Sequence, residues 1–172
     1  MPAFTNICTM LPFDQKLLSE IGKELLKNEQ TIAVAESVTT GMIQQAMGSI
    51  KDAMQFYQGG ITTYNIPQKF RHLGVEPIAA EKCNAVSGAV ASQMALGVSA
   101  LFGSHWGIGI TGYASPVPES GNRLFAYFAI AFRKKVLAEK ILHHRKKTDS
   151  VADVQLTYVN AVLAALHKVL SS

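Results

Sequence analysis

The spacing of apolar positions along the chain changes repeatedly between a helix-type and a strand-type pattern. In several segments the apolar residues recur every three or four positions or follow helix-start signals, which predicts helices with one buried face; they are residues 14–28, 38–48, 67–73, 87–103 and 151–169. Between them lie short apolar runs of the kind that form strands, at residues 31–35, 59–64, 105–111, 124–132 and 136–144.

Local signals at the segment ends support this division. Asp14 and Ser87 stand where a helix N-terminus is favoured, Pro67 falls in a first helical turn, and Gly103 marks a helix end. The last two strands are separated only by "RKK", which predicts an antiparallel hairpin. The order α-β-α-β-α-α-β-β-β-α therefore predicts an α/β fold, a three-layer α/β/α sandwich with a mixed central sheet.

Length and composition predict a single domain over residues 1–172, with an irregular N-terminal segment at residues 1–13. This segment has no helix signal, and its apolar residues are expected to pack across their own domain or a second subunit. No apolar run is long enough to span a bilayer and no secretory signal is recognisable, so we expect a cytoplasmic protein without a membrane partner. Cys8 and Cys83 lack the spacing of a metal site or disulfide framework, so no metal is expected.

The formal net charge of +4 arises largely from the basic segment at residues 133–147. Apolar residues alternate with lysines there, which favours the solvated face of an edge strand, because edge lysines block pairing with other chains. Binding of an anion or nucleotide is the alternative interpretation. No motif for nucleic-acid binding accompanies the charge, so no nucleic-acid partner is expected.

Three strand-to-helix junctions carry candidate chemistry: "AESVTTG" at 35–41, "GGITTYNIPQKFRHLGV" at 59–75 and "GIGITGYAS" at 107–115. In layered α/β folds ligands gather at such junctions, where free N–H groups attract phosphates and oxyanions. Taken alone, Ser37 is more typical of a helix N-cap than of a nucleophile, and Glu36 of a polar residue that merely ends a strand. Tyr64 and Lys69 are likewise more typical of a surface.

The order of these motifs resembles the C-terminal domain of the CinA family, over about residues 14–170. "AESVTTG" is similar to an AESCTGG pattern, and "GGITTYNIPQKFRHLGV" to GGxxxYxxxxKxxxLGV. "AVSGAVASQMALGV" is similar to AVSxxVAxxMAxGV, and "GIGITGYASP" to GxxxTGxAGP. Four motifs in the same order identify the chain as a member of this family.

The resemblance implies a nicotinamide mononucleotide deamidase, which converts its substrate to nicotinic acid mononucleotide and ammonia without a metal or cofactor. Ser37 then matches the nucleophile, Lys69 the general base and Tyr64 an assisting hydroxyl. A small-molecule nucleotide is the implied partner, and a homo-oligomer is favoured. The residues expected to bind the substrate are Glu36, Thr39, Thr40, Gly41, Gly59, Gly60, Thr111 and Gly112; Arg71 and the cluster around Arg145 are electrostatic candidates for the phosphate.

These roles are chemically coherent. A serine hydroxyl needs a base to remove its proton, and a lysine serves as that base when burial or a neighbouring positive charge lowers its pKa. Ser37 and Lys69 must therefore meet in the fold. Backbone N–H groups at residues 38–41 are the expected donors to the oxyanion, each worth about 3 kcal/mol when well aimed.

The chain also departs from the family pattern. Thr40 replaces a glycine, and a β-branched residue is strained if that position requires a positive φ. Ser115 replaces a later glycine, and Ser150 and Asp153 stand near expected arginines, which weakens the case for a phosphate site. A catalytically impaired module that binds a nucleotide or another partner is therefore the alternative to the enzyme.

Overall fold

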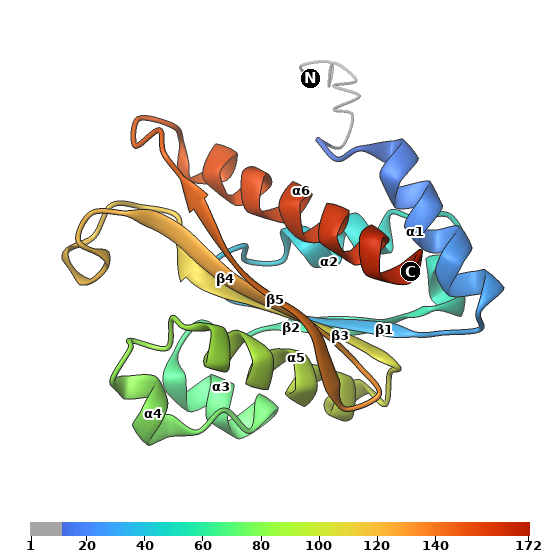
Figure 1. Ribbon diagram of the computed structural model, residues 1–172, viewed down its shortest axis with the longest axis horizontal. Coiled ribbons are helices and arrows are strands. Elements are labelled where there is room, and N and C mark those ends of the chain that lie inside the picture. The colour runs from blue at the N-terminus through green and yellow to red at the C-terminus, as the bar shows by residue number, and fades with distance from the viewer. Residues whose placement is uncertain (1–11) are drawn as a thin grey trace, which may run out of the picture.

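The computed structural model describes residues 12–172 and consists of one twisted sheet between two layers of helices (Figure 1). The predicted irregular segment, residues 1–13, therefore lies outside the described residues except for Pro12 and Phe13, of which Phe13 is buried. The predicted three-layer α/β/α architecture with a mixed sheet is confirmed.

The helices and strands follow the predicted order closely. The helices are α1 (Gln15–Lys27), α2 (Met42–Gly48), α3 (Ile66–Leu73), α4 (Pro77–Glu81), α5 (Gly88–Phe102) and α6 (Val151–Leu170). The strands are β1 (Ile32–Glu36), β2 (Tyr57–Thr62), β3 (Trp106–Tyr113), β4 (Leu124–Phe132) and β5 (Lys135–His144). None of the helices in the described part of the chain is long and apolar enough to cross a membrane.

The sheet has the strand order β2-β1-β3-β4-β5. The strand β1 runs parallel to both of its neighbours, β2 and β3. The strand β4 runs antiparallel to β3 and to β5, with which it forms the predicted hairpin. The C-terminal ends of three parallel strands consequently lie at one edge of the fold, where ligands of α/β proteins commonly bind.

Each face of the sheet has its own apolar core. The helices α1, α2 and α6 cover one face and α3, α4 and α5 the other (Figure 1), so alternate residues of β1 such as Val34 and Ala35 enter different cores. The helix α5 packs directly against β3. A Cβ added at Gly107 or Gly109 of this strand would collide with the backbone of α5, so glycine permits the close approach. This close packing fixes the end of β3 relative to the other strands.

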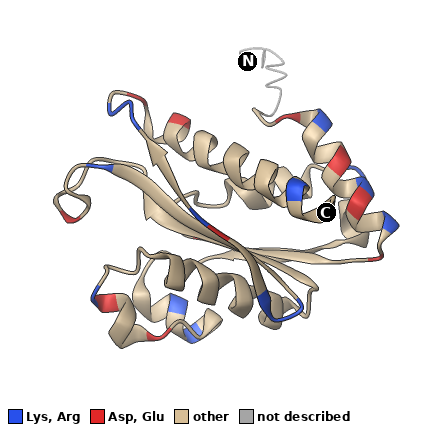
Figure 2. Cartoon of the chain, viewed as in Figure 1, with Lys and Arg blue, Asp and Glu red and all other residues tan. Residues whose placement is uncertain are grey.

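The basic segment lies mainly on β5, which is the edge strand at one side of the sheet. Its lysines at 135 and 140 are exposed, and Figure 2 shows cations of this segment towards both ends of the strand and beside an acidic residue at its middle. The predicted edge position and solvent exposure of this strand are confirmed.

Two helical details differ from the predictions. The helix α2 begins at Met42 instead of residue 38, and the five-residue helix α4 was not predicted. The helix α4 is short, and its N-terminus is held by the side chain of Glu76, which accepts hydrogen bonds from the N–H groups of Ile78 and Ala79. The reason for the late start of α2 lies in the residues of the candidate site.

Candidate active site

Two parallel strand ends bring the first two junctions together. The strands β1 and β2 pair along their length, and the N–H of Thr63 donates to the carbonyl oxygen of Glu36 at 2.9 Å just beyond the last residue of β2. The chain then enters α3, where Asn65 caps the N-terminus by accepting from the N–H of Gln68. The connection between β2 and α3 therefore brings the second helical turn of α3 close to the end of β1.

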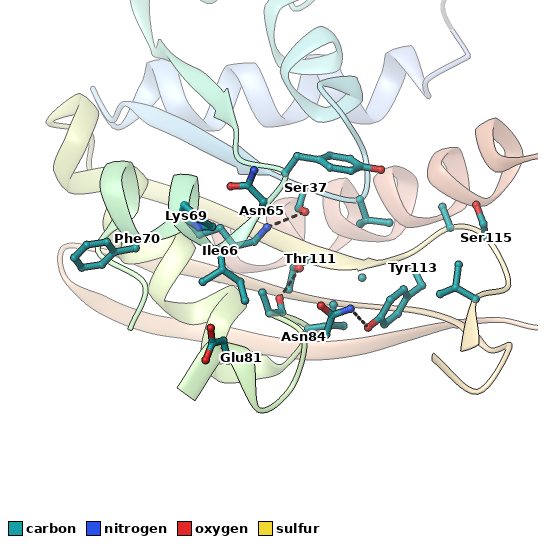
Figure 3. A pocket seen from close by; sticks show the side chains of 18 of the residues that line it. Ser37, Asn65, Ile66, Lys69, Phe70, Glu81, Asn84, Thr111, Tyr113 and Ser115 are labelled. Atoms are coloured by element: carbon teal, nitrogen blue, oxygen red, sulfur yellow. Dashed lines mark hydrogen bonds between the residues drawn. The ribbon is translucent and has the colours of Figure 1, made fainter. Parts of the chain in front are cut away.

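Ser37 and Lys69 meet at this point. The ammonium of Lys69 donates to the hydroxyl oxygen of Ser37 at 3.0 Å and to the carbonyl oxygen of Thr63 at 2.7 Å (Figure 3). The side chain of Lys69 is only 1% exposed, and burial lowers its pKa from the ordinary 10.5 to about 8. A serine hydroxyl therefore lies beside an amine that is able to lose its proton near neutral pH.

Glu36 is fully buried and organises the loop that follows β1. Its carboxylate accepts hydrogen bonds from the hydroxyl of Thr39 and from three backbone N–H groups, those of Gly41 (3.1 Å), Ile43 (3.1 Å) and Gln44 (2.8 Å). It thus satisfies N–H groups that the first turn of α2 leaves without helical partners. The interpretation of Glu36 as a residue that merely ends a strand is wrong.

The expectation that Ser37 caps α2 is also wrong, because Gly41 occupies the N-cap position with a φ of +104°. The N–H of Thr40 donates to the carbonyl oxygen of Ser37 at 3.3 Å, and that of Gly41 donates to Glu36. Among the described residues, no acceptor pairs with the N–H groups of Val38 and Thr39. Of the four expected oxyanion donors, these two have no acceptor, and Val38 is the one of them that lines the cavity described below.

A cavity of about 780 Å³ lies in front of the Ser37 and Lys69 side chains, within the roughly 300–1,000 Å³ usual for small-molecule sites. It is bounded by α3 and α4, the end of β3 with its following loop, and the start of α6. Its walls are formed by Ser37, Val38, Tyr64, Asn65, Ile66, Pro67, Lys69, Phe70, Pro77, Glu81, Asn84, Ala85, Val86, Thr111, Gly112, Tyr113, Ala114, Ser115, Val117, Val151 and Gln155.

Several residues expected to bind substrate do not line this cavity, namely Glu36, Thr39, Thr40, Gly41, Gly59 and Gly60. Gly59 has a φ of +125° and faces the ring of Phe102, while Gly60 faces the side chain of Gln44 and the backbone of Val34. Side chains at these two positions would collide with their neighbours. The two glycines thus allow close packing around β2.

The remaining predicted site residues do line the cavity. Thr111 is buried and donates its hydroxyl proton to the carbonyl oxygen of Ala85, and Gly112 follows it on β3. Tyr64 also lines the cavity but is 74% exposed, which places its side chain toward solvent. The third junction therefore forms the wall of the cavity that faces Ser37, with Thr111 between Ser37 and the outer part of that wall (Figure 3).

Residues from distant parts of the sequence complete the site. The side-chain amide of Asn84 donates to the hydroxyl oxygen of Tyr113 at 3.0 Å across the wall opposite Ser37 (Figure 3). The side-chain amide of Gln155, on α6, donates to the carbonyl oxygen of Val38 at 2.7 Å and to the hydroxyl of Thr40 at 3.2 Å. Sequence reasoning missed Asn84 and Gln155, since no local pattern marks either residue.

Comparison with known proteins agrees with this arrangement of motifs. The family model described as "CinA C-terminal domain" matches residues 14–170. The chain belongs to the CinA C-terminal domain family.

Relatives with this domain occur in longer proteins. The CinA-like protein of Rippkaea orientalis is 40% identical over 103 residues, and that of Trichodesmium erythraeum is 42% identical over 105 residues. Each alignment covers 60% of this chain, and the chain spans about a quarter of the length of these relatives, 25% and 24%. The similarity thus concerns one part of each relative.

Solved structures match the fold over nearly their whole length. The CinA superfamily protein of Klebsiella pneumoniae 700603 has a TM-score of 0.84 at 27% identity, covering 91% of this chain and 97% of the other. The competence damage-inducible protein A of another Klebsiella pneumoniae strain has a TM-score of 0.85 at 28% identity, covering 91% and 96%. This chain therefore has the fold of CinA structures.

This CinA domain differs from the family motif at Thr40, and the structure shows the predicted backbone conformation there. Thr40 has a φ of +49°, in the left-handed region that a β-branched residue seldom adopts. Its hydroxyl, however, accepts the hydrogen bond from Gln155, which ties the loop to α6. The hydrogen bond offsets part of the backbone strain.

We expect Thr40→Gly to raise the free energy of unfolding by about 1 kcal/mol, because release of left-handed strain exceeds the loss of one exposed hydrogen bond. Thr40→Ala is the matched control, since it removes the same hydroxyl but keeps a Cβ at positive φ. Denaturant unfolding of the two variants measures the difference. Equal stability of the glycine and alanine variants would contradict the proposed strain.

The two positions near expected arginines, Ser150 and Asp153, form the N-terminus of α6 in this CinA domain. The hydroxyl of Ser150 accepts from the N–H of Asp153 at 3.2 Å and donates to its carboxylate at 2.6 Å. In the preceding loop, Asp149 pairs with Lys146 at 2.6 Å and with His144 at 3.0 Å. These side chains stabilise the turn into α6.

Proposed function

We propose that this chain is an amidase that hydrolyses the carboxamide of a nicotinamide compound, nicotinamide mononucleotide being the one that the family resemblance implies. The observation that carries the proposal is the 3.0 Å hydrogen bond between Lys69 and Ser37 at the wall of a cavity. A nucleophile and a base within hydrogen-bond reach are the minimal requirement for covalent amide hydrolysis.

In the acylation step, neutral Lys69 takes the proton of the Ser37 hydroxyl while the serine oxygen bonds to the carboxamide carbon. The resulting oxyanion accepts a hydrogen bond from the N–H group of Val38, which lines the cavity. Lys69 then gives its proton to the departing nitrogen as the carbon–nitrogen bond breaks, so that ammonia leaves. The products of this step are an ester on Ser37 and a neutral lysine.

Deacylation uses the same groups in the reverse direction. Lys69 takes a proton from a water molecule as the water oxygen attacks the ester, and the proton then returns to the serine oxygen as the carboxylic acid leaves. The carbonyl oxygen of Thr63 holds the lysine in place throughout, at 2.7 Å from its nitrogen. In this scheme Tyr64 assists from the rim of the cavity, as the resemblance implies.

The pH dependence of ammonia release tests this proposal. Because Lys69 acts as a base only when neutral and its pKa is about 8, about one-tenth of the chains are active at pH 7. We expect kcat/KM to rise about tenfold between pH 7 and a plateau above pH 8. The assay uses nicotinamide mononucleotide and nicotinamide riboside in parallel.

A rate that is independent of pH across this range would contradict a lysine base. No ammonia from either compound would contradict the amidase. Binding of a nicotinamide compound without hydrolysis would instead favour the impaired binding module, which the threonine at the positive-φ position 40 motivates.

A further inference from the structure

The charges that line the cavity are few and do not suit a phosphate. Among the described lining residues, Lys69 is the one cation and Glu81 the one anion. The ammonium of Lys69 is buried and already donates to Ser37 and to Thr63. A phosphate in this cavity would therefore meet the carboxylate of Glu81 and gain no free cation.

Cations in the neighbouring loops are held elsewhere. The guanidinium of Arg123 lies 5.7 Å from the centre of the Phe125 ring and its Nε donates to the carbonyl oxygen of Ser120. Lys146 forms its ion pair with Asp149.

The two arginines considered as phosphate ligands, Arg71 and Arg145, are exposed, and neither lines the cavity. Residues 1–11, which the structure does not describe, contain no Lys, Arg or His. The chain's own basic side chains thus provide no phosphate site at this cavity.

The wall opposite Ser37 has features that suit a planar cation. The ring of Tyr113 is held at one end by the hydrogen bond from Asn84 and along its edge by Phe125, with ring centres 5.4 Å apart. Aromatic faces attract cations, and the carboxylate of Glu81, on another part of the cavity wall, adds a longer-range attraction. The oxygen of the Asn84 amide and the hydroxyl proton of Tyr113 remain available for a polar ligand group.

We propose that the preferred substrate is a pyridinium carboxamide that carries no phosphate group, such as a nicotinamide nucleoside. This inference rests on the proposed amidase function and specifies its substrate class. The pyridinium ring lies against Tyr113, Glu81 complements its positive charge, and the carboxamide reaches Ser37. A bound pyridinium also keeps Lys69 neutral, because a nearby positive charge disfavours protonation of the lysine, whereas a phosphate favours it.

Nicotinamide riboside and nicotinamide mononucleotide differ only in the phosphate and form the decisive pair. We expect kcat/KM for the riboside to exceed that for the mononucleotide by about tenfold or more, which corresponds to about 1.4 kcal/mol of discrimination. Equal values, or a preference for the mononucleotide, would overturn the inference while leaving the amidase intact.

A binding measurement separates this inference from the proposed chemistry. Calorimetry with Ser37→Ala protein compares the two compounds without turnover, so it decides the preference even if the native chain releases no ammonia. The riboside is expected to bind with a Kd about tenfold lower than that of the mononucleotide. Failure of both compounds to bind would also overturn the inference.

Charge reversal at the cavity provides a second test of the proposed substrate preference. Glu81→Lys should reduce the riboside preference about fivefold to tenfold, and high salt should reduce the effect of this substitution because it screens exposed charges. Glu29→Lys is the matched control, since Glu29 is exposed and does not line the cavity. An unchanged preference in Glu81→Lys would contradict the assigned role of Glu81.

Discussion

Replacing Lys69 with methionine is expected to abolish turnover and, at the same time, to stabilise the fold at neutral pH. Methionine keeps much of the volume of the lysine but has no proton acceptor, so Ser37 loses its base and the rate falls by about a thousandfold or more. Ser37→Ala should cause a loss of similar size by removing the nucleophile. Ammonia release measures both losses.

The stability effects of the two substitutions should have opposite signs. Holding Lys69 protonated in a site that lowers its pKa from 10.5 to about 8 costs about 3 kcal/mol at pH 7. Methionine removes that cost but leaves the carbonyl oxygen of Thr63 without its donor, so a net gain of about 1–2 kcal/mol is expected. Ser37→Ala removes an acceptor from the buried lysine and should destabilise the fold by about 1 kcal/mol.

The advantage of the methionine variant should disappear in alkaline solution. Between pH 8 and 10.5 the unfolded chain keeps the proton of Lys69 while the folded chain has lost it, so the stability of the native protein rises with pH. Burial and then Glu36 raise the pKa of Tyr57 to about 12, and burial raises that of Tyr158. Both tyrosines are present in both proteins, so their titration cancels in the difference.

Urea unfolding at pH 7 and pH 10 measures this difference. Lys23→Met is the matched control, because Lys23 is exposed on α1 and should change neither the rate nor the pH dependence of stability. If the methionine variant at position 69 is less stable than the native protein at pH 7, burial of the Lys69 ammonium does not destabilise the fold as proposed.

The meeting of Ser37 and Lys69 was predicted because the family resemblance implies complementary roles for them, although each residue taken alone indicated a helix cap or a surface position. Once β1 and β2 pair in parallel, their ends coincide, and the short helix after β2 returns its second turn to the end of β1. The order of helices and strands along the chain and the last hairpin followed from periodicity, whereas the strand order within the sheet was not predicted. Motif resemblance thus predicted a contact that the local pattern around each residue did not indicate.

Contacts around the cavity between distant segments were not predicted. Asn84, Tyr113 and Gln155 come from three segments that are far apart in the chain; one hydrogen bond joins Asn84 to Tyr113, and Gln155 makes two, to Val38 and Thr40. Thr40 illustrates a partial success, since the motif indicated strain there but gave no sign of the stabilising contact from α6. Such contacts depend on tertiary packing rather than on local propensity.

Local sequence reasoning was most misleading for Glu36. Its replacement should have a large effect on both the free energy of unfolding and kcat. Glu36→Gln preserves shape but converts one accepting oxygen into a donating NH₂ group. The Glu36 carboxylate faces only donors, namely the Thr39 hydroxyl and the N–H groups of Gly41, Ile43 and Gln44. At least one of these buried groups must lose its acceptor.

We expect Glu36→Gln to lower the free energy of unfolding by about 2–4 kcal/mol, because buried donors without acceptors cost about 1–3 kcal/mol each. For a chain of this size the melting temperature should fall by roughly 5–15 °C. Turnover measured well below that temperature should fall about tenfold or more in kcat with a smaller change in KM, since the loop that positions Ser37 and the Val38 amide loosens while the cavity walls remain.

Thr39→Val provides a milder version of the same change, because it removes one donor to Glu36 and leaves the carboxylate and its three backbone partners in place. It should cost about 1 kcal/mol in stability and lower kcat less than Glu36→Gln does. Glu29→Gln, at an exposed position, controls for the loss of charge. A Glu36→Gln protein with the native kcat would mean that the loop holds Ser37 in place without the carboxylate. The hydrogen bonds from the start of α2 to Glu36 would then contribute to stability and not to turnover.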